Sequence, residues 1–163
     1  MVKGVRDRYD GKRRNPWNEV ECGSHYARAL SVWSVLLALA GYHYSAPERH
    51  LTIAPKLNAD DFRCFFAAGT GWGSYSQRTN ATSLAAKLEI NYGETRARKI
   101  TLQNAGGWKN VAVASARGPD GKRLANCQAS VEGDTINVEL GEELVVPSGK
   151  SVGINLIAAR ARA

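Results

Sequence analysis

The chain has 163 residues, of which 44% are hydrophobic, and a formal net charge of +7. This length allows one domain with a hydrophobic core, and the hydrophobic content excludes intrinsic disorder. Charged residues follow Met1 at once, so no apolar signal-peptide core is present there. No apolar run reaches the roughly twenty residues that a membrane-spanning helix needs. We therefore expect a protein without a transmembrane segment that is cytoplasmic if Met1 is the true start; an internal start at Met1 would leave the location open.

The first predicted element is a helix over residues 25–40, whose apolar side chains recur at helical spacing almost all round. Ser24 suits the N-cap position, and Gly41 suits the C′ position that ends a helix. A helix that is apolar on every side is normally buried. The strands predicted after it would cover only one of its faces, and each large side chain left in water forgoes about 1.5–3 kcal/mol. We expect neighbouring helices, from a missing N-terminal part or from another copy.

A polar cluster precedes and enters this helix. Glu19 and Glu21 lie just before it, where the partial positive charge of a helix N-terminus favours carboxylates. Arg28 lies about one turn inside and needs a partner, because an unpaired buried charge is costly. The cluster is either a structural Glu–Arg pair or a group that grips neighbouring hydroxyls of a sugar. In the second case Trp17 offers an aromatic face on which a pyranose ring can stack.

The segment Arg6–Ala29, with its motifs Asn15-Pro16-Trp17-Asn18-Glu19 and His25-Tyr26-Ala27-Arg28, resembles the signature near the C-terminus of family 116 glycoside hydrolases. These enzymes are the bile-acid β-glucosidase, or non-lysosomal glucosylceramidase, group. The likeness continues through Gly41–Tyr44 and Gly71–Gln77. It implies that residues 24–40 are the terminal helix of an (α/α)6 barrel. Together with the strands that the later residues predict, the expected fold class is α+β, with this helix followed by an antiparallel β-sheet or sandwich.

The resemblance also implies a function. In the family, the matching glutamate and arginine contact glucose hydroxyls in the glycone subsite, so Glu19 and Arg28 become candidate substrate-binding residues, with Trp17 and His25 beside them. The family hydrolyses β-glucosides with retention, but its nucleophile and acid/base precede this block. The resemblance therefore implies no catalytic residue in this chain, no cofactor and no metal. Its expected partners are a glucoside or glycolipid-type sugar and the missing N-terminal part of the same enzyme.

Local carboxylates do not replace the missing pair. Retaining hydrolysis needs two carboxyl groups about 5–5.5 Å apart on either side of the scissile bond. Glu19 and Glu21 would approach a sugar from the same side. We expect Asp60 and Asp61 to cap a short helix at residues 62–63 instead.

The rest of the chain predicts strands separated by turn residues. Alternation is clearest from Leu84 to Tyr92, where every second residue, Tyr92 included, is assigned to an inward face. The expected strands span residues 50–55, 84–92, 96–102, 111–116, 124–131, 135–140, 143–146 and 151–157. With a link near residues 79–82, we expect a barrel end over residues 1–78 and a β-rich segment over residues 83–163.

Two other ligand classes are not favoured. The three cysteines and three histidines have no metal-ligand spacing. The basic N-terminal arm suggests nucleic acid, but Asp7 and Asp10 interrupt it and no nucleic-acid-binding signature follows. We expect no nucleic-acid partner.

Two functions from different classes stay open. The chain is either the C-terminal part of a β-glucosidase-like glycoside hydrolase or a stand-alone, non-catalytic β-sandwich module that binds carbohydrate or protein. An in-frame helical sequence upstream of Met1 favours the first, and a stop codon directly before Met1 favours the second.

Overall fold

The computed structural model describes residues 3–4, 7, 12 and 33–159. Two compact units divide the chain, residues 1–38 and residues 39–163. The described residues form one named helix, α2 (Trp33–Ala40), and nine strands. The strands are β1 (Tyr42–Ser45), β2 (His50–Ile53), β3 (Asp61–Ala68), β4 (Gly71–Thr79), β5 (Ser83–Gln103), β6 (Val111–Arg117), β7 (Gln128–Glu132), β8 (Thr135–Pro147) and β9 (Ser151–Ala158).

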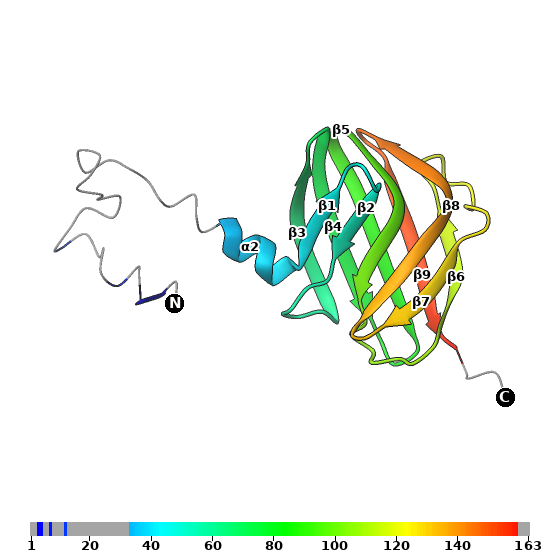
Figure 1. Cartoon of the computed structure of the whole chain (residues 1–163), viewed down its shortest axis with the longest axis horizontal. Coiled ribbons are helices and arrows are strands. Elements are labelled where there is room, and N and C mark those ends of the chain that lie inside the picture. Colours follow the sequence, from blue (N-terminus) through cyan, green and yellow to red (C-terminus); the bar gives the residue numbers. More distant parts are fainter. Residues whose placement is uncertain (1–2, 5–6, 8–11, 13–32, 160–163) are drawn as a thin grey trace. The chain divides into compact units, whose positions relative to one another are not determined.

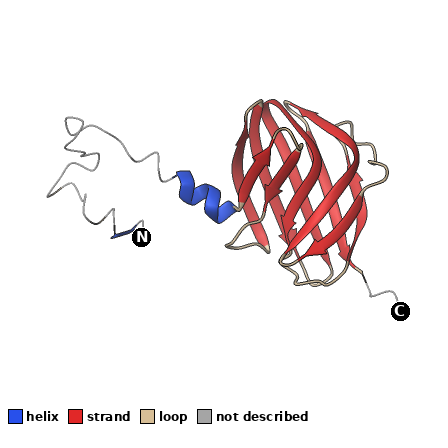
Figure 2. Ribbon diagram, viewed as in Figure 1, coloured by secondary structure: helices blue, strands red, loops and turns tan. Residues whose placement is uncertain are grey.

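The strands build a sandwich of two five-stranded sheets that share the long strand β5 (Figures 1 and 2). Sheet A has the order β1-β2-β5-β8-β7, and sheet B has the order β3-β4-β5-β9-β6. All neighbouring strands are antiparallel except β2 and β5, which are parallel. The first half of β5 thus belongs to sheet B and the second half to sheet A.

Gly93 marks the point where β5 passes from one sheet to the other. Gly93 pairs with β4, whereas the next residue, Glu94, pairs with β8. The φ angle of Gly93 is +69°, and a Cβ there would collide with the carbonyl oxygen of Thr70. Only glycine fits a left-handed position that is also this crowded. The sharing of β5 therefore depends on one residue.

The hydrophobic core lies between the two sheets, where inward side chains of both meet. Every second residue of β5 is buried through most of its length, as the period-two pattern predicts. The largest fully buried apolar side chains come from both sheets and are Phe66, Leu51, Ile53, Leu84, Leu102, Ile136, Leu156, Val138, Val146 and Val152.

The expected fold class is wrong. The described residues are mostly strand with a single short helix and contain no helices of an (α/α)6 barrel. The barrel end was expected over residues 1–78, but residues 42–78 lie in β1 to β4 and the turns between them. The apolar spacing over residues 25–40 predicted a long helix, of which Trp33–Ala40 is helical and residues 25–32 lie outside the described part. The expected stop is confirmed, since Gly41 follows the helix with a φ of +57°.

Two further differences follow from strand geometry. The short helix expected at residues 62–63 is wrong, because both residues lie in β3. The residues near 79–82, where we expected a link between domains, lie between β4 and β5, which are neighbours in sheet B. Among the described residues, no helix combines the length and the hydropathy needed to cross a bilayer.

Candidate functional site

The outer face of sheet B carries three large aromatic side chains in solvent, here called the aromatic row: Phe65, Trp72 and Tyr92. They come from the neighbouring strands β3, β4 and β5 and are 50%, 43% and 66% exposed. The ring centroids of Phe65 and Trp72 are 6.0 Å apart. Those of Trp72 and Tyr92 are 6.4 Å apart, with ring planes only 17° from parallel. The strands thus hold the three rings together as one surface.

Glycines on both sides of Trp72 set its position. A Cβ at Gly71 would collide with backbone atoms of Tyr92 and Glu94, and a Cβ at Gly73 would collide with the carbonyl oxygen of Glu89. Glycine at these positions therefore lets β4 approach β5 closely. The strand register shifts at the same place, so that Trp72 pairs with Tyr92 while Gly73 pairs with Ile90. Asn91 of β5 is thus an extra residue without a partner on β4, which makes a β-bulge and changes the direction of the side chains beside it.

Polar groups follow the aromatic row along the strands. Glu89 pairs in register with Ser74 on one side and Ser151 on the other. Its carboxylate accepts a hydrogen bond from Lys87 at 2.5 Å and one from Ser74 at 3.4 Å. The hydrogen bond from Lys87 lowers the pKa of Glu89. Glu89 is therefore an ionised acceptor, and its side chain is 39% exposed.

One row further on, cations alternate with small residues across all five strands. The register partners, in order from β3 to β6, are Arg63, Ser76, Lys87, Gly153 and Arg117. We call these three basic residues the cation row. The outer face of sheet B thus presents Trp72 and Tyr92 first, then Phe65 together with the hydrogen-bonding groups Ser74 and Glu89, and then the cation row.

This arrangement is suited to binding rather than to catalysis. Aromatic rings offer apolar faces for stacking, and the carboxylate and hydroxyls beside them hydrogen-bond to polar groups of a ligand. General-acid catalysis by a glycosidase needs a carboxyl group whose pKa is raised. The pKa of Glu89 is displaced the other way. Large exposed apolar patches rimmed by polar residues mark interaction sites.

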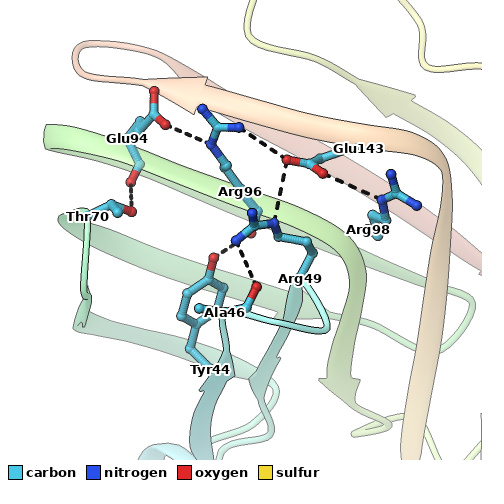
Figure 3. A network of polar contacts seen from close by, with 8 residues as sticks. All are labelled: Tyr44, Ala46, Arg49, Thr70, Glu94, Arg96, Arg98 and Glu143. Atoms are coloured by element: carbon cyan, nitrogen blue, oxygen red, sulfur yellow. Dashed lines mark hydrogen bonds and ion pairs between the residues drawn. The ribbon is translucent and has the colours of Figure 1, made fainter.

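A second polar cluster, on sheet A, is accounted for by the fold (Figure 3). The carboxylate of Glu143 lies 3.4 Å from a guanidinium nitrogen of Arg96 and 3.6 Å from Arg49 and from Arg98. Glu94 lies 2.8 Å from Arg96 on the other side. Residues 140–143 of β8 stand opposite Arg98 alone in the register of β5. The ion pairs therefore tie this irregular part of β8 to β5 and to the turn before β2.

The substrate-binding residues expected from the sequence, Trp17, Glu19, His25 and Arg28, lie outside the described residues. Sequence reasoning missed the aromatic row. Tyr92 was assigned to the inward face, whereas the bulge beside it turns it outward. The available signal was the Gly71-Trp72-Gly73 sequence, since glycine on both sides of an aromatic residue in a strand indicates close backbone approach.

No group of three or more potential metal ligands comes together among the described residues. A comparison of the chain with protein-family models, curated proteins and solved structures finds no match. The inference about function therefore depends on the geometry of the site.

Proposed function

We propose that the chain is a non-catalytic β-sandwich module that binds carbohydrate on the outer face of sheet B. The aromatic row is the observation that carries this proposal, because three adjacent rings on rigid strands remain in solvent. Pyranose rings present C–H groups that stack on such rings, and their hydroxyls match the acceptor Glu89 and the hydroxyls of Ser74 and Ser151. Sites on strands are also held more precisely than sites on loops.

A protein partner is the competing occupant of this face. The cores of protein interfaces are depleted of charged residues. Here an ionised carboxylate, Glu89, lies in the same register row as Phe65, and Arg63 and Lys87 lie within ion-pair distance of it. Desolvating these groups against an apolar protein surface is costly. Sugar hydroxyls replace the hydrogen bonds of water, so they avoid most of that cost.

Affinity electrophoresis of the full 163-residue chain in gels containing soluble polysaccharides tests the proposal. We expect retardation in at least one gel of a panel of neutral and acidic polysaccharides, and its loss in the Trp72→Ala variant. The matched control is Leu57→Ala, which removes another exposed apolar side chain (57% exposed) from a loop outside sheet B. Migration unchanged by every polysaccharide, with the variant behaving like the parent, would overturn the proposal.

The resemblance of residues 6–78 to family 116 glycoside hydrolases favours a second candidate. In it, the chain is the C-terminal part of a β-glucosidase-like enzyme, and Glu19 and Arg28 contact the sugar. The isolated chain is then inactive, and the assembled enzyme loses activity on an aryl β-glucoside when Glu19 is changed to Gln. Each lost charge-assisted hydrogen bond costs about 1.5–3 kcal/mol. Unchanged hydrolysis by that variant would exclude the sugar contact.

A further inference from the structure

We infer that the glycan bound on this face is acidic, and that carboxylate or sulfate groups along a linear chain pair with the cation row. The inference rests on the proposed function and adds the chemical class of the ligand. Its basis is the charge, the spacing and one unexplained glycine on the outer face of sheet B.

The charges on this face do not cancel. Four cations, Arg63, Arg78, Lys87 and Arg117, face two carboxylates, Asp61 and Glu89, which leaves 4 − 2 = +2. Asp61 is paired with Arg78 at 3.2 Å, on the last register pair of β3 with β4. Glu89 is shared between Lys87 at 2.5 Å and Arg63 at 3.9 Å.

Arg117 pairs with no carboxylate of the described residues. Its guanidinium donates one hydrogen bond, 3.0 Å long, to the carbonyl oxygen of Gly121. A carbonyl oxygen leaves the charge of the guanidinium uncompensated, and a guanidinium binds carboxylate and sulfate groups through two parallel hydrogen bonds. The surplus positive charge of the face is therefore available to an anionic ligand.

The spacing suits a linear polymer. Lys87 on β5 is two strands away from Arg63 on β3 and two strands away from Arg117 on β6. Strands lie ~4.8 Å apart, so the cations recur at roughly 10 Å across the sheet. Ser76 lies four positions after Trp72 on β4, which puts the cation row roughly 13 Å from Trp72 at ~3.3 Å per residue, whereas Phe65 lies two positions, roughly 7 Å, from Arg63 on β3. A chain of several sugars reaches both rows.

Gly153 lies between Lys87 and Arg117 and has no structural reason to be glycine. Its φ is outside the left-handed region, and a Cβ built on it meets nothing within 4 Å. Glycine inside a strand is unfavourable, because it loses more conformational freedom on folding than any other residue. A glycine inside a strand marks a bulge, a tight bend, or the close approach of another backbone or of a ligand. Gly153 is paired in register with Lys87 and Arg117 and has open space at its Cβ, which favours the ligand. At this position it leaves open space between two cations.

Single-stranded nucleic acid also combines stacking with negative charge. Glu89, however, lies between Tyr92 and Lys87 on β5, next to any ligand backbone that joins the Trp72–Tyr92 pair to the cation row. A nucleic acid carries a phosphate at every nucleotide, and this carboxylate repels it. In a glycan the hydroxyls between acidic groups donate hydrogen bonds to the same carboxylate, so the glycan fits the order of the rows better.

Isothermal titration of the full chain with alginate, polygalacturonate and chondroitin sulfate tests the inference, with carboxyl-reduced polygalacturonate as the neutral counterpart. We expect at least tenfold tighter binding of one acidic polymer than of the neutral one, and weaker binding as salt rises. Lys87→Ser and Arg117→Ser should each weaken the acidic ligand at least threefold. The control Lys109→Ser, which changes an exposed lysine in the loop between β5 and β6, should leave the affinity unchanged.

Gly153→Val provides a readout that a structural role would not give. Valine favours strands and has room here, so we expect the melting temperature to stay equal or rise while the affinity for the acidic polymer falls at least tenfold. Equal binding of acidic and neutral polymers overturns the inference and leaves the proposed function standing. Binding of no polysaccharide overturns both. Tighter binding of oligo(dT) than of any glycan replaces both with nucleic-acid binding.

Discussion

The outer faces of the two sheets use their side chains in different ways. On sheet A, polar groups hydrogen-bond to one another across the strands. The imidazole of His50 lies 2.8 Å from the Thr101 hydroxyl, which donates to Asn137 at 2.6 Å. The amide of Asn137 then donates to Glu132 at 2.8 Å. Although they lie on an outer face, Thr101 and Asn137 are only 7% and 8% exposed.

On sheet B, the side chains of the aromatic row contribute little to the stability of the fold. The rings of the aromatic row contact each other but leave 43–66% of their surface in solvent. Exposed aromatic surface forgoes the burial energy of about 1.5–3 kcal/mol per side chain. The hydrogen-bonded polar groups on sheet A therefore stabilise the fold, whereas the solvent-exposed aromatic surface on sheet B is available to a ligand. Substitutions on the two faces should therefore separate stability from binding.

The largest expected effect is at Gly73, where both properties depend on one residue. Gly73→Ala places a methyl group against the carbonyl oxygen of Glu89. Because backbone has to move, we expect a loss of about 3 kcal/mol or more in the free energy of unfolding, measured by urea denaturation. The shift also separates Trp72 from Tyr92, so binding should fall with stability. Gly149→Ala serves as a control outside sheet B, since its Cβ meets nothing, although its φ of +75° also carries strain.

Asn137→Ala should lower the stability of the protein without affecting ligand binding. The substitution removes the acceptor of the Thr101 hydroxyl and a donor to the Glu132 carboxylate, which costs about 1–3 kcal/mol of unfolding free energy. Polysaccharide affinity should stay within twofold of the parent, because the residue faces away from sheet B. A stable Asn137→Ala variant with weakened binding would reverse the roles assigned to the two faces.

Tyr92→Ala should have the opposite effect, weakening ligand binding while leaving the stability nearly unchanged. The side chain is 66% exposed, so its removal should change the free energy of unfolding by no more than about 0.5 kcal/mol. Binding should weaken by about 1–2 kcal/mol, because the ring is buried only when a ligand covers it. Val145→Ala, which removes an exposed apolar side chain of β8 (36% exposed), is the matched control on sheet A. Equal loss of binding in both variants would contradict the comparison.

Several strands could be predicted from the sequence because turn residues bound them. The expected strands at residues 111–116 and 151–157 agree with β6 and β9 within one residue at each end. Two expected strands, 84–92 and 96–102, form the single strand β5. Gly93-Glu94 was interpreted as a turn, but Gly93 pairs with β4 as part of β5, and its left-handed conformation only redirects the strand into the second sheet. A glycine signals a change of direction without showing how large it is.

Strands β3 and β4 could not be predicted as such, because the resemblance had assigned their residues to the end of a helical domain. Alternation of polar and apolar residues was nonetheless present at the start of β3, where the exposed Asp61 and Arg63 alternate with the partly buried Phe62 and Cys64, although Phe65 and Phe66 interrupt it. The outward position of Tyr92 had no signal in a period-two pattern, since one extra residue in a bulge reverses every side chain after it. The direction of Tyr92 depends on the register between β4 and β5, and this register cannot be read from a single sequence.

The smallest expected effect concerns pH and separates the faces once more. Burial, and after it the charge of Lys99, lowers the pKa of His50 below its usual 6.5, against the opposing charges of Glu48 and Glu139. The unfolded chain therefore binds a proton at His50 more readily than the folded chain does. Stability from this residue is complete above pH 6.5 and is lost as the pH falls through the lowered folded pKa.

Between pH 7.5 and 5.5 we expect the melting temperature to fall less in His50→Gln than in the parent. Parallel curves would show that protonation of His50 is not coupled to folding. Because Glu89 has a pKa below its usual 4.5, the face of sheet B keeps its charges over the same range. Glycan affinity should therefore stay constant while sheet A loses stability.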